Sequence, residues 1–214
     1  MKVLAFDVDA VIFDLDGTLL DSERAICDAA VAALLEVDVR VSTLAVADHL
    51  GAPLEELYTL FVGDGDDVRM RHFVARYIAI HDEHPDRFPP ALPGVTDGLR
   101  ALVERGARIG LATTKPTPRA QAQLEGAGLA RFFLHVQGTD PGMKPKPAPD
   151  VVAAACAGLH VAAARALMVG DTPRDVAAAK AAGAFACVVS YRDARLAAAR
   201  AMNADAVISS LTEL

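Results

Sequence analysis

The chain has 214 residues, 53% of them hydrophobic, which is enough to bury the core of one or two domains. Its formal net charge of −7 argues against a large nucleic-acid-binding surface, because such surfaces are usually basic. No apolar stretch approaches the ~20 residues of a membrane span, and acidic residues interrupt the first apolar run too early for a signal peptide, so we expect a soluble protein.

The cysteines give an expectation about the compartment. Cys27, Cys156 and Cys187 are odd in number, far apart and without Cys-x-x-Cys spacing. This pattern indicates reduced thiols in the core rather than a disulfide framework. We therefore expect a cytoplasmic protein.

An Asp-x-Asp pattern occurs twice near the start of the chain, each time after a short apolar run. Only the second pair, Asp14 and Asp16, is followed by Gly-Thr, and the glycine permits a sharp turn out of the strand. After Asp7 and Asp9 the chain instead runs on into further apolar residues. We therefore predict that the first pair lies near solvent on an earlier extended segment and that only the second pair forms a site.

Residues 22–88 carry three apolar stripes at helical spacing and no convincing strand, which predicts a small helical bundle. The Pro-rich stretch Phe88 to Gly94 then marks a return to another kind of structure. The simplest organisation is an α/β core, residues 1–21 and 89–214, interrupted by a helical insertion at residues 22–88.

After residue 90, short apolar strands alternate with helices. Strands are predicted over 108–112, 134–137, 166–169 and 186–189, and helices over 96–105, 118–124, 150–157 and 173–182. This alternation is typical of βαβ units and predicts a doubly wound parallel sheet with helices on both faces.

Polar residues occur at four expected strand ends, one after the apolar run at 11–13 and three after residue 90. They are "DLDGT" (14–18), "TTKP" (113–116), "KPKPAP" (144–149) and "GDTPRD" (170–175). In an open parallel sheet, ligands bind beyond the carboxyl ends of the strands, so we expect these segments to converge on one crevice.

These ordered motifs resemble those of the haloacid dehalogenase (HAD) superfamily. The resemblance covers roughly Val11 to Tyr191, and it is greatest to phosphoglycolate phosphatase-like members, which usually have Asn where this chain has Thr114. It implies a Rossmann-like core, a C1-type helical cap that closes over the crevice, and Mg²⁺-dependent hydrolysis of phosphate esters through an aspartyl-phosphate intermediate.

The residue types fit this chemistry. Asp14 ends a strand, and its carboxylate can attack phosphorus, while Asp16 can protonate the leaving alcohol and later accept a proton from water. The resemblance implies that Asp14 and the backbone carbonyl of Asp16 bind the metal. Asp171 is the best further ligand, with Asp175 as its outer-shell partner, and hard oxygen ligands favour Mg²⁺.

Thr113 can donate a hydrogen bond to a phosphate oxygen, with the backbone N–H groups around Thr114 beside it. A lysine should supply positive charge to Asp14 and the phosphoryl group. Lys144 is favoured over its rival Lys146 because it holds the first position of the KPxPxP pattern. Lys115 is interpreted as a solvated loop residue.

Several alternatives stay open at this stage. A phosphomutase would share the nucleophile and the metal, although phosphomutases resembling this fold tend to carry an acidic residue where Gly170 stands. A dehalogenase would lack Asp16, and a non-catalytic receiver or binding protein would lack some of the motifs.

We therefore expect a phosphatase, monomer or homodimer, that acts on a small soluble phosphate ester, with phosphoglycolate as the family-implied first guess. Neither a nucleic acid nor a membrane is expected as a partner.

Overall fold

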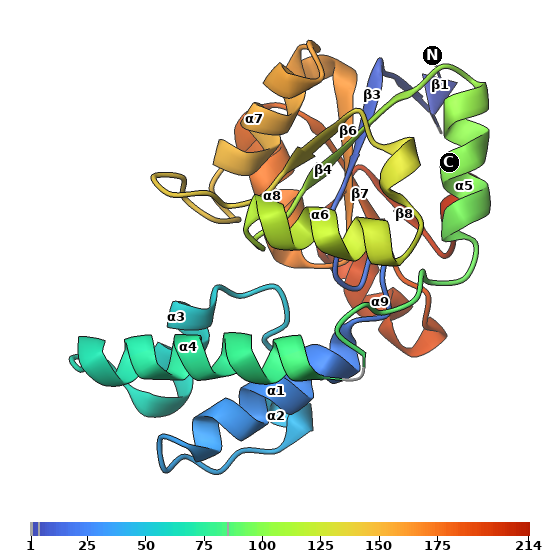
Figure 1. The fold of residues 1–214 in the computed structure, drawn as a ribbon. Helices are drawn as coiled ribbons and strands as arrows, with labels where there is room; N and C mark the ends of the chain where they lie inside the picture. The colour runs from blue at the N-terminus through green and yellow to red at the C-terminus, as the bar shows by residue number, and fades with distance from the viewer. Residues whose placement is uncertain (1, 4, 85) are drawn as a thin grey trace. The chain divides into compact units, whose positions relative to one another are not determined.

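The computed structural model describes residues 2, 3, 5–84 and 86–214. The chain divides into two compact units, one formed by Met1–Asp21 with Pro90–Leu214 and the other by Ser22–Pro89. The first is an α/β unit and the second is helical (Figure 1). The first boundary, after residue 21, is where the sequence analysis placed it, and the second lies one residue later, after residue 89.

The α/β unit is built on a six-stranded sheet in which each neighbouring pair of strands is parallel. In spatial order its strands are β5 (His135–Gln137), β4 (Arg108–Ala112), β3 (Ala10–Phe13), β6 (Ala166–Gly170), β7 (Phe185–Val189) and β8 (Ala206–Ile208). The chain starts at β3 in the middle, moves outward through β4 and β5, and then returns to β6 on the other side. The predicted doubly wound fold is confirmed, with β8 as an additional strand.

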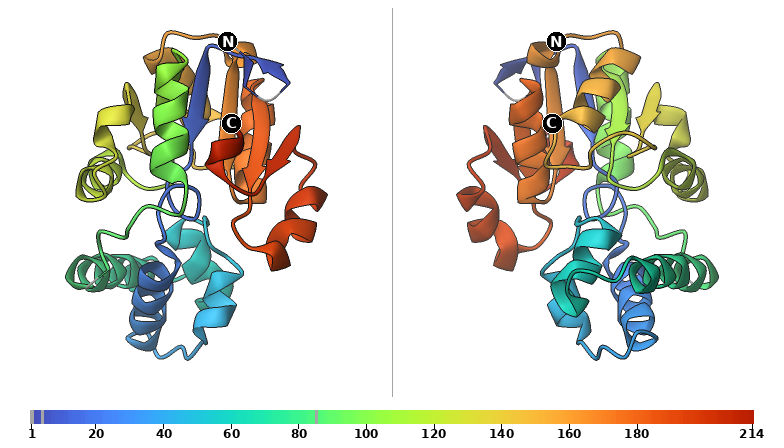
Figure 2. Two further views of the ribbon diagram at one scale, coloured as in Figure 1. Left: turned by 90° about the vertical axis from the view of Figure 1, so that its right-hand side faces the viewer. Right: turned by 90° about the vertical axis from the view of Figure 1, so that its left-hand side faces the viewer.

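Helices cover both faces of this sheet (Figure 2). Successive β3 residues point to opposite faces, so Val11 and Phe13 join one buried cluster while Ala10 and Ile12 join the other. The first cluster includes residues of α5 (Val95–Glu104) and α6 (Thr117–Gly126), and the second includes residues of α7 (Asp150–Gly158), α8 (Pro173–Ala182) and α9 (Asp193–Ala201). Burial on both faces explains why the strands are apolar throughout.

Short elements complete the α/β unit. They are the 3₁₀ turns at Ala130–Phe132, Ala163–Arg165 and Leu211–Glu213, and the antiparallel hairpin of β1 (Lys2–Val3) and β2 (Phe6–Asp7). Cys156 and Cys187 in this unit, and Cys27 in the helical unit, are buried, and none of them forms a disulfide within the described part of the chain, as the sequence predicted.

The hairpin accounts for the first Asp-x-Asp pair. Asp7 and Asp9 are exposed, and both carboxylates accept hydrogen bonds from the guanidinium of Arg165, which also holds their pKa values below the usual range. They lie before β3, at the opposite end of this strand from Asp14. The prediction that their carboxylates lie near solvent is confirmed.

The helical unit has its own core. Its helices are α1 (Glu23–Leu35), α2 (Thr43–Ala47), α3 (Leu54–Val62) and α4 (Asp67–Glu83). Buried residues from all four form one cluster, in which the rings of Tyr58 and Phe73 lie 5.7 Å apart. A separate core of this kind is what an inserted bundle needs in order to fold as a unit.

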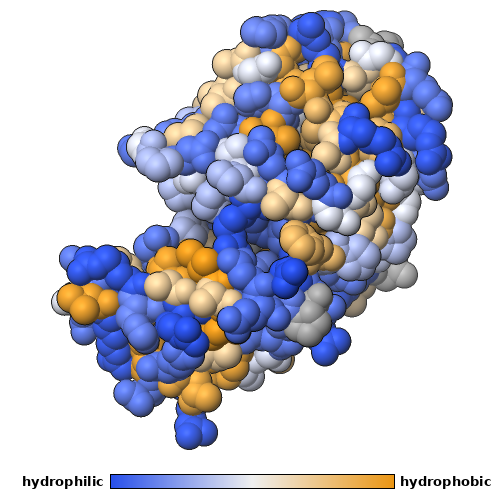
Figure 3. All heavy atoms as spheres, viewed as in Figure 1, coloured by the Kyte–Doolittle hydropathy of each residue, from blue (hydrophilic) through white to orange (hydrophobic). Residues whose placement is uncertain are grey.

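The visible surface of both units carries mainly hydrophilic side chains, interrupted by separate apolar groups (Figure 3). Within the described part of the chain, no helix combines the length and the apolar character needed to cross a membrane.

Leu99 and Val103 on α5 offer a matched test of the core. Leu99 is fully buried in the cluster that α5 shares with the sheet, whereas Val103 is 46% exposed on the same helix. Leu99→Ala should lower the free energy of unfolding by about 2–5 kcal/mol because it leaves a cavity. Val103→Ala should change it by less than about 0.5 kcal/mol. Urea denaturation of the two variants measures both, and equal losses would contradict this packing.

Candidate active site

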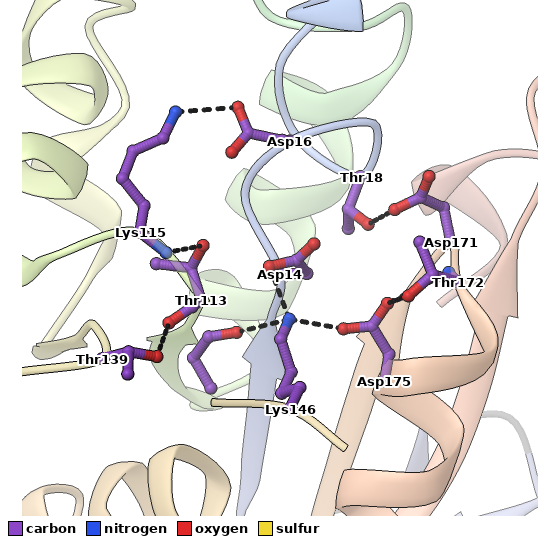
Figure 4. A network of polar contacts seen from close by, with 11 residues as sticks. Asp14, Asp16, Thr18, Thr113, Lys115, Thr139, Lys146, Asp171, Thr172 and Asp175 are labelled. Carbon is purple, nitrogen blue, oxygen red and sulfur yellow. Dashed lines mark hydrogen bonds and ion pairs between the residues drawn. The ribbon is translucent and has the colours of Figure 1, made fainter. Parts of the chain in front are cut away.

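The site lies at the carboxyl ends of β3, β4 and β6. The strand order reverses here, because β4 lies on one side of β3 and β6 on the other. Asp14 directly follows β3, and its backbone N–H bonds the carbonyl of Val169 at 2.9 Å. Figure 4 shows side chains from all four motif segments, together with Thr139, gathered around it. The convergence expected from the sequence motifs is present in the structure.

Lys146 supplies the cation next to Asp14. Its Nζ donates to Asp14 Oδ1 at 2.7 Å, to Asp175 Oδ1 at 2.5 Å and to the carbonyl oxygen of Ala112 at 3.1 Å (Figure 4). These acceptors satisfy all three N–H donors of a buried ammonium. Asp14 Oδ2 accepts no hydrogen bond from the other described residues, although the residue itself is buried.

This geometry corrects the placement of the lysine. Lys144, which the motif position favoured, has an exposed side chain, and among the described residues it contacts only Asp150, whose Oδ2 accepts from its backbone N–H at 3.0 Å. In an extended segment, residues two apart point the same way only if the chain stays regular. Here a turn closed by the Ala148 N–H and the Pro145 carbonyl, 3.0 Å apart, begins between the two lysines, and only Lys146 contacts Asp14.

Asp175 is fixed by the start of α8. Its Oδ2 accepts hydrogen bonds from the backbone N–H and the hydroxyl of Thr172, at 3.0 and 2.6 Å, which forms a capping box. One oxygen therefore caps the helix while the other binds Lys146. The local sequence "TPRD" is thus a helix start that also delivers a carboxylate to the site.

Asp171 follows β6 and faces the turn after Asp16. Thr18 Oγ1 donates to Asp171 Oδ1 at 3.0 Å, and the hydroxyl of Tyr191 donates to the Thr18 carbonyl oxygen at 2.7 Å. Gly17 has φ +76°, and a Cβ there would lie 2.4 Å from Asp171 Oδ2. Glycine is therefore required both by the backbone conformation and by this close approach.

Three of the predicted metal ligands form one cluster. Carboxylate oxygens of Asp14, Asp171 and Asp175 lie within 4.8 Å of one another. Such a set of hard oxygen donors suits a divalent cation like Mg²⁺. The side chain of Asp16 lies outside this cluster, since it pairs with Lys115 instead.

The charges of the cluster explain why a cation would bind there. Burial raises the pKa of Asp14 to about 6; the Asp175 carboxylate adds to the rise, and the Lys146 ammonium opposes it. Burial also raises the pKa of Asp171 well above its usual value, with Asp175 and Asp14 contributing. A raised carboxyl pKa means that negative charge is disfavoured in this place, and a bound cation would compensate it.

Thr113 lies buried at the end of β4. Its backbone N–H bonds the carbonyl of Gln137 at 3.0 Å, its carbonyl accepts from Thr139 Oγ1 at 3.2 Å, and its Oγ1 accepts from the backbone N–H of Lys115 at 3.3 Å. The hydroxyl hydrogen of Thr113 has no acceptor among the described residues. This hydrogen can therefore be donated to a ligand. Thr114, the next residue, is half-buried.

Lys115 departs from its prediction as a solvated loop residue. Its Nζ donates to Asp16 Oδ1 at 3.0 Å and to Gln123 Oε1 at 2.5 Å, and its side chain is only 11% exposed. Gln123 is buried on α6. Lys115 lies within the "TTKP" motif, but the sequence contained no signal for its pairing with Asp16.

Comparison with known proteins agrees with this geometry. Residues 11–189 match the model of the family described as haloacid dehalogenase-like hydrolase. A phosphoglycolate phosphatase of Rhodospirillum rubrum is 39% identical over 191 residues, which cover 85% of this chain and 79% of the relative. A plasmid-encoded phosphoglycolate phosphatase of Cupriavidus necator is 32% identical, over 100% of this chain and 94% of the relative.

A solved structure shares the fold. The haloacid dehalogenase-like family hydrolase from Streptococcus pneumoniae superposes with a TM-score of 0.83 at 23% identity, covering 97% of this chain and 96% of that one. At this identity the likeness speaks for the fold alone.

Lys146 and Lys144 provide a matched test of the site. Lys146→Met would leave the buried carboxylates of Asp14 and Asp175 without their cation, so the free energy of unfolding should fall by about 3–5 kcal/mol. Lys144→Met removes only an exposed charge and should change it by less than about 0.5 kcal/mol. Guanidinium denaturation of the metal-free proteins gives both values. A larger loss for Lys144→Met would reject the assignment.

Proposed function

Because the chain belongs to the haloacid dehalogenase-like hydrolase family, we propose that it is a phosphatase that hydrolyses small phosphate monoesters. The observation that carries this proposal is the Asp14 carboxylate. Lys146 holds one of its oxygens, the other accepts no hydrogen bond from the described residues, and Asp16 lies two residues further on. Relatives named as phosphoglycolate phosphatases make phosphoglycolate the first substrate to test.

The reaction would proceed in two steps. Asp14 Oδ2 attacks the phosphorus atom, the bond to the ester oxygen breaks, and Asp16 gives its proton to the leaving alcohol. Water then attacks the acyl phosphate and passes a proton back to Asp16, which frees phosphate and restores the Asp14 carboxylate. One water is consumed, alcohol and phosphate are released, and Asp14 and Asp16 return to their starting protonation states.

The surrounding residues would bind and orient the phosphoryl group. Thr113 can donate its hydroxyl hydrogen to a phosphoryl oxygen, and Lys146 keeps Asp14 in one orientation while it offsets the negative charge that gathers there. Asp14, Asp171 and Asp175, with the backbone carbonyl of Asp16, would hold Mg²⁺, which supplies positive charge to the phosphoryl oxygens.

A phosphomutase is a weaker candidate. The acidic residue that such enzymes tend to carry would replace Gly170, where a Cβ would lie 2.2 Å from Asp175 Cγ. Asp175 already fills this space and is tied to Lys146 and Thr172. A side chain at position 170 would therefore have to displace a carboxylate of the site.

Asp14→Asn and Asp7→Asn test the nucleophile. The first change removes the attacking carboxylate, so phosphate release from phosphoglycolate, p-nitrophenyl phosphate and sugar phosphates should fall about a thousandfold or more. The second alters an exposed ion pair before β3 and should change rates only a few-fold. Assays of phosphate release under saturating Mg²⁺ make the comparison. Similar losses in both variants would mean that Asp14 is not the nucleophile.

Removal of divalent metal should also abolish turnover. Treatment with a chelator leaves the clustered carboxylates of Asp14, Asp171 and Asp175 uncompensated, so they should repel the substrate phosphate. Addition of Mg²⁺ should restore the rate, and Asp171→Asn should raise the Mg²⁺ concentration needed for half-maximal activity at least about tenfold. Full activity in a preparation shown by elemental analysis to be metal-free would refute the role of the cluster.

A further inference from the structure

Lys115 is a second, partly buried cation of the site, and the two reaction steps above give it no role. It follows β4 on the same segment as Thr113, and its ammonium reaches Asp16 rather than solvent. Gln123 on α6 accepts a second hydrogen bond from the same Nζ at 2.5 Å. A lysine held by two neighbours in this way has a defined position, which an exposed lysine lacks.

The ammonium retains capacity for a ligand. Lysine has three N–H donors, and two acceptors contact Nζ within the described part of the chain. The side chain is 11% exposed, and that of Asp16 is 20% exposed, so part of the pair is accessible to solvent. One donor of Lys115 is therefore available beside the residue that would face the leaving group.

The position of this donor relative to a substrate can be bounded. If Asp16 protonates the leaving oxygen, that oxygen lies about 3 Å from the Asp16 carboxylate. Lys115 Nζ is 3.0 Å from Asp16 Oδ1, so Nζ lies no more than about 6 Å from the leaving oxygen when Oδ1 makes the bond. A carboxylate one carbon away extends about 3 Å from the leaving oxygen, so it comes within hydrogen-bond reach of Nζ when it points toward Lys115.

We propose that Lys115 is a specificity-determining residue, which binds an anionic group carried one carbon from the leaving oxygen. The proposal rests on the phosphatase function proposed above and narrows its substrates to phosphate esters of short 2-hydroxycarboxylates. Gln123 positions Lys115 for this contact.

The test compares two esters that differ only at this group. Phosphoglycolate carries the carboxylate, and 2-hydroxyethyl phosphate carries a neutral hydroxymethyl group in its place. We measure kcat and KM for both with wild-type protein, Lys115→Met, Lys115→Arg and, as a matched control, Lys144→Met, whose lysine is exposed. Thermal unfolding of each variant verifies that the fold is retained.

The expected result is a change in the ratio of the two kcat/KM values. Wild-type protein should prefer phosphoglycolate, and Lys115→Met should reduce this preference about 10- to 100-fold, the effect of one charge-assisted hydrogen bond, mainly through KM. Lys115→Arg should keep part of the preference, and Lys144→Met should keep all of it. Rates with both esters are expected to fall in Lys115→Met, because Asp16 loses a partner, so the ratio is the decisive quantity.

Three results would overturn the inference while the phosphatase function stands. The first is an equal loss of kcat/KM on both esters in Lys115→Met, which would make Lys115 only a support for Asp16. The second is a wild-type protein that does not prefer phosphoglycolate. The third is a loss of preference in Lys144→Met equal to that in Lys115→Met. Absence of any Asp14-dependent phosphate release from either ester or from p-nitrophenyl phosphate would instead reject the phosphatase function itself.

If Lys115→Met does not fold, binding supplies the same comparison. In an Asp14→Asn background, calorimetry with phosphoglycolate and 2-hydroxyethyl phosphate should show that Gln123→Leu weakens the first ligand more than the second. Equal weakening of the two ligands would again overturn the inference.

Discussion

The ammonium group of Lys146 is buried at the carboxyl ends of β3 and β4. A buried charge is stable only if it is paired and fully hydrogen-bonded. Asp14, Asp175 and the Ala112 carbonyl meet this requirement, so one cation joins the ends of β3 and β4 to the first turn of α8. In these contacts Asp14 Oδ1 accepts a hydrogen bond from Lys146, while Oδ2 accepts none from the described residues. The orientation of the nucleophile is thus a consequence of satisfying a buried lysine.

The remaining charges follow from this arrangement. Four carboxylates, those of Asp14, Asp16, Asp171 and Asp175, lie near two lysines, and burial raises the pKa of Asp14 and Asp171. Lys146 forms ion pairs with Asp14 and Asp175, and Lys115 forms one with Asp16. Excess negative charge is left around Asp171, where a divalent cation would compensate it.

The topology of the sheet makes these contacts between distant residues possible. Because β3, β4 and β6 are parallel neighbours, their carboxyl ends meet at one edge, and loops after them need to extend only a few residues to touch. Apolar strands buried on both faces make that edge rigid. The helical unit, with its own core around Tyr58 and Phe73, was inserted just after β3 without interrupting this framework.

The sequence by itself determined the fold class, the helical insertion and the positions of Asp14, Thr113 and Asp171, because apolar runs that end in Asp or Thr are local features of strands and their turns. Predictions of their catalytic roles await the experiments. Only the tertiary structure decided between Lys144 and Lys146 and brought Lys115 to Asp16. The reason is that a lysine side chain is long and flexible, and the loops around 115 and 146 have no periodicity. Where its ammonium lies depends on which buried acceptors the folded chain brings within reach, and no local pattern encodes that.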